Sequence, residues 1–334
     1  MTRLTAAGPS GSQAAGALQR WSRRLFPTFA TASLVTALLV ITLGGVVRVT
    51  GSGLGCPDWP LCHGRVIPPP DVKAWIEYTH RLSASLVSVF VVLMAVTGVA
   101  REGLRRGAVL PLAAPVLLAA QAALGAITVR LEINAAVALT HTVVAMAFLA
   151  LLAVVASGEA PWRSSVGEPV QAALAGHPRG RRVRLTFVAL AVVTYGLLIS
   201  GAYVYRSGAP LACLGYPLCG APAGTESARG LQDIHMLHRY LALATALLTG
   251  HALGVAWRLK LPTRRLLALA GGIGGLMALQ VALGASNVLF RLPEWARLGH
   301  LVAASLAFAL IVLTAGTVWR KPVAAGRPRE ESRA

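Results

Sequence analysis

The chain has 334 residues, of which 55% are hydrophobic and 13% are charged, and its mean hydropathy is +0.64. A soluble domain carries about twice that share of charged residues, so the composition excludes an ordinary soluble protein. The net charge of +19 does not indicate nucleic-acid binding, because the basic residues lie in short runs between apolar blocks, without interleaved aromatic residues. We therefore expect a polytopic membrane protein with the lipid bilayer, and no nucleic acid, as its partner.

Eight apolar blocks are each long enough to cross a bilayer, which takes about 20 residues in a helix. Helices are expected because backbone polar groups within lipid have no water to bond. The predicted fold class is therefore an all-α membrane protein. The expected spans are residues 27–49, 75–99, 107–129, 134–157, 184–206, 231–257, 264–289 and 294–319.

The segments outside these spans indicate the orientation. Residues 1–26 are rich in Gly, Ala and Ser and are expected to form a disordered tail, without a cleavable signal peptide. Residues 158–183 are expected to be a linker, and residues 320–334 a second tail. Most Lys and Arg residues fall in these segments or on the same side of the spans, so both termini are predicted to be cytoplasmic. This topology predicts a bacterial plasma-membrane protein.

The two halves of the chain repeat one another at a nearly constant spacing. A steady spacing indicates tandem duplication of a four-helix unit, here residues 27–157 and 184–319. Both units then have the same topology, and a pseudo-two-fold axis along the membrane normal is expected. The equivalent pairs, 157 to 159 residues apart, are Cys56 and Cys213, Cys62 and Cys219, His80 and His238, Gln121 and Gln280, and His141 and His300.

Four histidines lie inside or at the mouths of the predicted spans, where ionisable residues are rare and functional. His80 and His141 lie at similar depths near the outer surface, on two helices of the first unit, and His238 and His300 do so in the second. Two imidazoles at one level can ligate a haem iron. The alternative is a set of core histidines that join helices by hydrogen bonds. Zinc would need a third or fourth protein ligand.

The four cysteines lie in two loops predicted to be on the outer face, an oxidising compartment in bacteria. The local disulfides Cys56–Cys62 and Cys213–Cys219 are favoured over crossed pairings, although the sequence alone does not fix the connectivity. Either pair could clip its loop or carry electrons. We expect the second pair to be structural and leave the role of the first open. His63 is expected to be a solvated loop residue.

Charged side chains accompany the first histidine of each unit. Arg81 and Arg239 follow His80 and His238 directly, and each could bind a haem propionate or simply extend its side chain to the interface. Glu77 lies three residues before His80 on the same helix face, where it could accept a proton, stabilise positive charge, or merely pair with Arg81. The second unit has His235 in that place. The halves therefore differ in acid–base chemistry.

Two motifs together resemble the haem A synthases. One is GGVVRVTGSGLGCPDWPLC over residues 44–62, and the other is Glu77-x-x-His80-Arg81. The resemblance covers nearly the whole chain, from the first predicted span to the last. It implies an enzyme that oxidises the C8 methyl group of haem O to the formyl group of haem A for terminal oxidases. It also implies two successive hydroxylations with water as the oxygen source.

The resemblance also implies roles for the site residues. His80 and His141 would flank substrate haem O, with Arg81 beside it, while His238 and His300 would ligate a haem b with Arg239 at its propionates. Glu77 matches the catalytic glutamate of the family, and Cys56 with Cys62 match its functional pair. Some relatives lack one or both cysteine pairs, so the catalytic need for the first pair is open.

Three other classes of protein share part of this pattern. A two-haem electron-transfer subunit would explain the histidines but not the difference between Glu77 and His235. A membrane thiol–disulfide oxidoreductase would use the cysteines and leave the histidines idle, and a transporter would share only the duplicated topology. The sequence leaves open the electron acceptor, homo-oligomerisation, and contacts with a haem O synthase (a farnesyltransferase) or oxidase assembly factors.

Overall fold

The computed structural model describes residues 11–103, 106–159, 162–220, 224–258 and 264–320. Within these ranges the regular structure is helical, apart from one isolated β-bridge between Cys62 and Arg65. The long helices are α1 (Gly11–Val49), α2 (Val72–Glu102), α3 (Val109–Arg130), α4 (Ala135–Ala156), α6 (Gly180–Arg206), α7 (Glu226–Arg258), α8 (Arg264–Leu289) and α9 (Glu294–Trp319). The short ones are η1 (Arg106–Ala108), η2 (Arg163–Gly167) and α5 (Glu168–Ala175).

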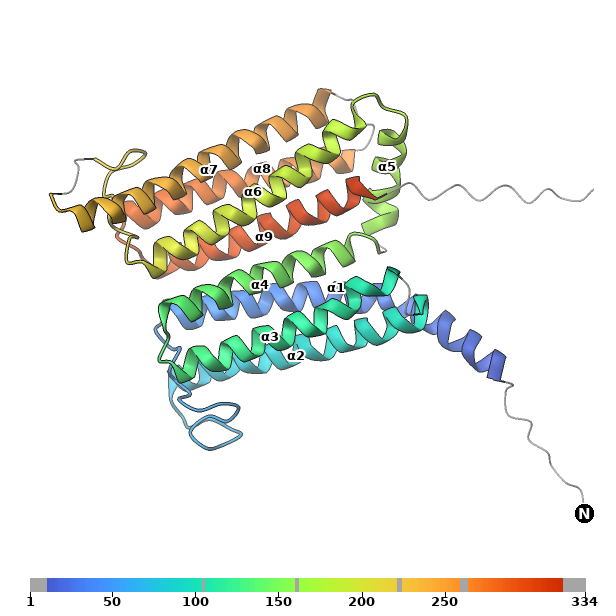
Figure 1. Ribbon diagram of the computed structural model, residues 1–334, viewed down its shortest axis with the longest axis horizontal. Coiled ribbons are helices and arrows are strands. Elements are labelled where there is room, and N and C mark those ends of the chain that lie inside the picture. Colours follow the sequence, from blue (N-terminus) through green and yellow to red (C-terminus); the bar gives the residue numbers. More distant parts are fainter. Residues whose placement is uncertain (1–10, 104–105, 160–161, 221–223, 259–263, 321–334) are drawn as a thin grey trace, which may run out of the picture.

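The long helices form two bundles that lie side by side, α1–α4 and α6–α9 (Figure 1). Helix α9 contacts both α1 and α4, and α6 also contacts α4, so these helices form the boundary between the bundles. The loops that follow α1 and α6 lie at one end of the molecule, and α5 lies at the other (Figure 1). All cysteines and the first histidine of each unit are therefore near the same end.

Helix α1 corrects one prediction. It begins at Gly11, so the expected disordered tail over residues 1–26 is wrong for residues 11–26, while residues 1–10 lie outside the described part of the chain. This segment contains Ala, Gln, Leu and Arg, which favour helix, and it is held by tertiary contacts. Ser22 and Phe26 are buried, and Gln19 donates a hydrogen bond to the carbonyl of Arg101 at the end of α2.

The expected linker over residues 158–183 also contains regular structure. It forms η2 and α5 and the first residues of α6, and it packs on the end of α9. Trp162 Nε1 donates to the hydroxyl of Thr317 at 2.7 Å, and Gln171 Nε2 donates to the Thr317 carbonyl at 3.1 Å. A linker anchored in this way holds the two bundles together at the end opposite the cysteine loops. Residues 321–334 of the predicted second tail lie outside the described residues.

A single hydrophobic cluster crosses the boundary between the bundles. Phe308 of α9 is buried in the same cluster as residues of α1, α2 and α4. Its ring stacks on Tyr195 of α6 at 5.8 Å, and the Tyr195 hydroxyl donates to the carbonyl of Val143 in α4. Helix α9 thus contributes side chains to the core of the first bundle as well as to that of its own bundle, and the two halves cannot separate without exposing this cluster.

Seven of the helices in the described part of the chain are long and apolar enough to cross a membrane: α1, α2, α3, α4, α6, α8 and α9. Helix α7 is of similar length, but its first part carries Glu226, Arg229, Asp233 and Arg239. The chain is therefore a helical membrane protein, as the composition predicts.

The shared core predicts a strong difference between two neighbouring positions of α9. Replacing Phe308 by Ala removes a buried ring and should cost about 3–5 kcal/mol of unfolding free energy. The matched control is Leu306→Ala, because Leu306 is exposed on the same helix. Thermal unfolding of the purified protein in detergent measures both. Equal losses for the two variants would contradict a core that joins the bundles.

Candidate functional site

The first histidine of each half packs against a glycine of the preceding long helix. A methyl group added at Gly44 of α1 would lie 3.0 Å from Cε1 of His80 in α2. The same addition at Gly201 of α6 would lie 3.0 Å from Cε1 of His238 in α7. These approaches are closer than side-chain packing normally allows. Glycine therefore lets each imidazole lie directly on the neighbouring helix.

The second histidine of each half has the same kind of support. A methyl group at Gly125 of α3 would lie 3.3 Å from Cε1 of His141 in α4, and one at Gly284 of α8 would lie 3.4 Å from that of His300 in α9. Side-chain amides join the same helices. The two bonds run from Gln121 Nε2 to the His141 carbonyl at 3.0 Å and from Gln280 Nε2 to the His300 carbonyl at 2.8 Å.

The structure places two of the predicted histidines in each bundle. His80 of α2 and His141 of α4 belong to the first bundle, and His238 of α7 and His300 of α9 belong to the second. His238 differs from the others because its Nδ1 is 2.8 Å from the hydroxyl of Ser200. A hydrogen bond at one ring nitrogen fixes the ring and leaves the other nitrogen free to bind.

The chemistry of these side chains fits a haem. Among the described residues, buried Nδ1 atoms of His80, His141 and His300 have no hydrogen-bond partner within the protein, nor do the Oε1 atoms of Gln121 and Gln280. Buried polar atoms without a partner are costly, and a bound polar or metal-containing group would offset that cost. No cluster of three or more His, Cys, Asp or Glu suited to a metal ion occurs in the described ranges. Two imidazoles are what an axially ligated haem iron requires.

Glu77 is buried beneath the first cysteine loop. Its side chain is 4% exposed, its Oε2 accepts the backbone N–H of Cys56 at 2.8 Å, and its Oε1 pairs with Arg81 Nη2 at 2.6 Å. A buried carboxylate is tolerated only when it is paired and hydrogen-bonded, and both conditions hold here. One turn farther along α2 lies His80. The carboxylate is therefore held rigidly at the edge of the first histidine pair.

Arg81 connects this carboxylate to the loop. Its Nη1 donates to the carbonyls of Asp58 and Leu61, at 2.7 and 2.8 Å, and its Nη2 donates to the carbonyl of Cys56 at 2.8 Å. With the ion pair to Glu77, these bonds use the four N–H donors of the two Nη groups. Arg81 therefore fixes the loop over α2. A role at a haem propionate stays a prediction.

The second loop is held in the same way, without the carboxylate. Arg239 donates through Nη1 to the carbonyls of Gly215, Pro217 and Leu218 and through Nη2 to that of Cys213. The propionate role predicted for Arg239 likewise stays a prediction. His235, in the place of Glu77, is buried, with its Nδ1 3.0 Å from the Ala209 carbonyl. The difference in acid–base chemistry between the halves is thus present at the site itself.

Both predicted disulfides are confirmed. Cys56 bonds to Cys62 and Cys213 bonds to Cys219. The first bond is inaccessible to solvent, because Cys56 and Cys62 are 0% and 1% exposed. A buried disulfide clips its loop, and exchange with another thiol would require the loop to open. The catalytic role of Cys56 and Cys62 stays a prediction.

Asp58 orders the tip of the first loop. Its two carboxylate oxygens accept the backbone N–H groups of Gly64 and His63, at 2.8 and 2.6 Å. These two hydrogen bonds, chiefly the one from Gly64, lower the pKa of the Asp58 carboxyl below its usual value. The exposed side chain of His63, expected to be solvated, folds back so that its Nε2 lies 2.9 Å from the carbonyl of Gly55.

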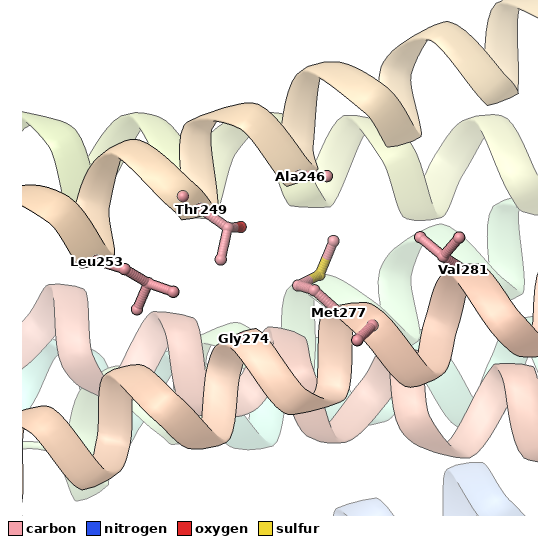
Figure 2. A pocket seen from close by; sticks show the side chains of 8 residues that line it. Ala246, Thr249, Leu253, Gly274, Met277 and Val281 are labelled. Carbon is pink, nitrogen blue, oxygen red and sulfur yellow. The ribbon is translucent and has the colours of Figure 1, made fainter.

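An apolar groove between α7 and α8 lies deeper in the second bundle. It has a volume of about 230 Å³. Figure 2 shows Thr249 and Leu253 of α7 on one side and Met277 and Val281 of α8 on the other. The residues that line it include no titratable group, so it offers no acid–base chemistry.

Sequence reasoning missed the glycines and underused the glutamines. Gln121 and Gly125 belong to the segment QAALGA, and Gln280 and Gly284 belong to the matching segment QVALGA, but only the spacing between Gln121 and Gln280 entered the predicted repeat. Glycine four residues after a glutamine, on the same face of a helix, could have indicated contact with the facing histidine.

The fold and the paired histidines define a helical membrane protein with one histidine-lined bundle in each half. Comparison with protein families identifies it further. Residues 27–315 match the family model COX15-CtaA, described as cytochrome oxidase assembly protein. The match covers most of the chain, so the chain belongs to this family.

Individual relatives agree with this result. The chain is 28% identical to a haem A synthase of Shewanella oneidensis over 88% of its own length and 97% of the relative. It is 31% identical to a haem A synthase of Bacillus pumilus over 62% of this chain and 67% of the relative. A haem A synthase of Exiguobacterium sibiricum is also 31% identical, over 65% and 69%. The predicted membership in the haem A synthase family is confirmed.

The hydrogen bonds of Arg81 predict slow reduction of the first disulfide. In Arg81→Gln, the rate of reduction of Cys56–Cys62 by a soluble phosphine should rise about tenfold or more, because even one lost charged hydrogen bond raises the opened fraction by roughly that factor. Alkylation followed by mass spectrometry measures the rate. The control is Arg65→Gln, which removes an exposed arginine of the same loop. Equal rates in the two variants would show that Arg81 does not hold the loop.

Proposed function

We propose that this chain is a haem A synthase that oxidises the C8 methyl group of haem O to a formyl group. Membership in the family supports the reaction, and the relatives named above carry this name. The observation that carries the proposal to this chain is the placement of Glu77. A buried carboxylate, one helical turn from His80, occurs in one half, and a histidine replaces it in the other.

The proposed topology has eight spans, with α7 as the one that composition alone does not identify. Both cysteine loops lie at one end, and the linker with α5 lies at the other (Figure 1). The basic residues of the linker support a cytoplasmic location for that end, by the positive-inside rule. The cysteine loops would then be on the outer face of a bacterial plasma membrane. The matching His–Gly contacts of the two halves support a pseudo-two-fold relation between them.

In this proposal each histidine pair holds one haem. His80 and His141 would hold substrate haem O beside Glu77, and His238 and His300 would ligate a haem b. When bound, haem b would supply an electron carrier within the membrane. Ser200 would fix the ring of His238. Gly44 and Gly201 would leave room for the imidazole rings of His80 and His238 beside the adjacent helices.

The chemistry would proceed by two hydroxylations of the methyl carbon. Each would take its oxygen from water and release two protons and two electrons, and the electrons would leave through haem b to an electron acceptor outside the chain. The resulting gem-diol loses water to give the formyl group. Oxidation at a carbon next to the macrocycle builds positive charge there, and a fixed carboxylate stabilises such charge. Glu77 is fixed by Cys56 and Arg81, and its position also suits it to accept a released proton.

A haem O synthase of the farnesyltransferase class would supply the substrate, and oxidase assembly factors would receive the product. The Cys56–Cys62 disulfide would contribute to catalysis at least by keeping the backbone N–H of Cys56 in its hydrogen bond with the Glu77 carboxylate. Association of copies of the chain is compatible with the exposed apolar helix faces, which also suit lipid.

The test is conversion of haem in cells that supply haem O. In Glu77→Gln, which keeps the size of the side chain and loses its charge, conversion should fall by at least about 100-fold, the scale of one lost electrostatic or acid–base contribution. Haems are extracted from the purified protein and identified by chromatography and mass.

The matched control is Glu132→Gln, which removes an exposed carboxylate near the same end. It should convert haem O like the wild type. A wild-type protein that contains haem b alone, and leaves supplied haem O unchanged, would contradict the enzyme and favour a two-haem electron-transfer subunit.

A further inference from the structure

Three arginines surround one tyrosine where the two bundles meet. The guanidinium carbons of Arg48 in α1, Arg206 in α6 and Arg297 in α9 lie 4.8, 5.6 and 6.0 Å from the centre of the Tyr205 ring. Arg48 and Tyr205 are 157 residues apart, the spacing that relates the cysteines, so they hold equivalent positions in the two repeats. The cluster, defined here as Arg48, Tyr205, Arg206 and Arg297, thus belongs to both halves.

The helices are brought together at this point by a glycine. A methyl group at Gly45 of α1 would lie 3.0 Å from Cδ1 of Leu298 and even closer to Leu301, both in α9. Gly45 is one turn from Arg48, and Leu298 is next to Arg297. The close approach of α1 and α9 therefore forces these two arginines to be neighbours. Arg297 also donates to the carbonyl of Val49 at 3.2 Å.

The positive charge of the cluster has no carboxylate partner. None of the ion pairs formed by the described residues includes any of its three arginines. Nε of Arg48 and Nε of Arg297 are buried and, within the described part of the protein, lack a hydrogen-bond partner. A tyrosine ring attracts cations only weakly, so three clustered guanidinium groups call for an anion.

The cluster lies next to both histidine pairs. Gly44, which contacts the His80 ring, is four residues before Arg48 on the same face of α1, so Arg48 is roughly 6 Å farther toward the cysteine-loop end. Arg297 is three residues before His300 on α9.

We propose that Arg48, Arg206 and Arg297 form one carboxylate-binding site, shared by the two halves, that receives the propionate groups of the haems held by the histidine pairs. This inference rests on the proposed function. Guanidinium groups bind carboxylates through paired hydrogen bonds, and propionates leave one edge of a porphyrin. Arg81 and Arg239 use their Nη donors on loop carbonyls, whereas this cluster has buried donors without partners.

The test compares iron protoporphyrin IX with its dimethyl ester, which has the same ring and iron but no carboxylates. Both are titrated into haem-depleted full-length protein in detergent, and binding is followed by the Soret band. The wild type should bind the free acid about tenfold or more tightly than the ester, the scale of one charge-assisted hydrogen bond. In Arg48→Gln or Arg297→Gln this preference should fall toward one, chiefly by weaker binding of the acid.

Two further variants make the result interpretable. Arg130→Gln removes an exposed arginine at the same end of α3 and should keep the wild-type preference. Arg48→Lys keeps the charge and should retain more of the preference than Arg48→Gln, even if the glutamine variant folds poorly.

Several outcomes would overturn the inference. If the arginine variants bind haem with the wild-type ratio of acid to ester, the site does not bind propionates, while the proposed function stands. If the wild type shows no preference and co-purifies with an anionic phospholipid that the variants lose, the site binds lipid phosphate instead. If the wild type binds neither porphyrin, both this inference and the proposed function fail.

Discussion

Four imidazoles inside apolar helix bundles are the constraint on which the rest of this structure depends. A buried imidazole costs free energy unless its nitrogens are bonded, and lipid supplies no water to bond them. Each imidazole ring lies against a glycine of an adjacent helix. Because glycine has no side chain, the imidazole ring determines how far apart the two helices lie. Gln121 and Gln280 join the helices that bear His141 and His300 to the preceding helices, α3 and α8. The outcome is one supported pair of imidazoles in each half.

Two further features couple these pairs to their surroundings. At one end, Arg81 and Arg239 fix disulfide-closed loops over the first histidine of each half. Between the bundles, Phe308 joins the two hydrophobic interiors, so that neither half is an independent unit. Glu77 is placed where loop, helix and histidine meet, and its burial is tolerable because Arg81 and the Cys56 N–H hold it. The Glu77 carboxylate therefore has two roles. It stabilises the loop through its bonds to Arg81 and the Cys56 N–H, and it is the group that the proposed chemistry requires.

Much of this arrangement could be predicted from the sequence. Long apolar blocks predict helices, and the constant spacing between Cys56 and Cys213 or His141 and His300 predicts the repeat. The helical start of α1 was missed because its Gly- and Ser-rich composition hid the contacts of Ser22 and Phe26. The cluster at Tyr205 could not be predicted, because Arg48, Arg206 and Arg297 meet only when the two bundles pack. Tertiary contacts of this kind leave no local pattern.

The central claim is that each histidine pair holds its own haem. The most direct measurement is the identity and amount of haem in His141→Ala and His300→Ala, purified from cells that supply haem O. The account predicts that His300→Ala loses haem b and keeps haem O, while His141→Ala loses haem O or its products and keeps haem b. Loss of the same haem in both variants, or wild-type content of both haems in either, would contradict it.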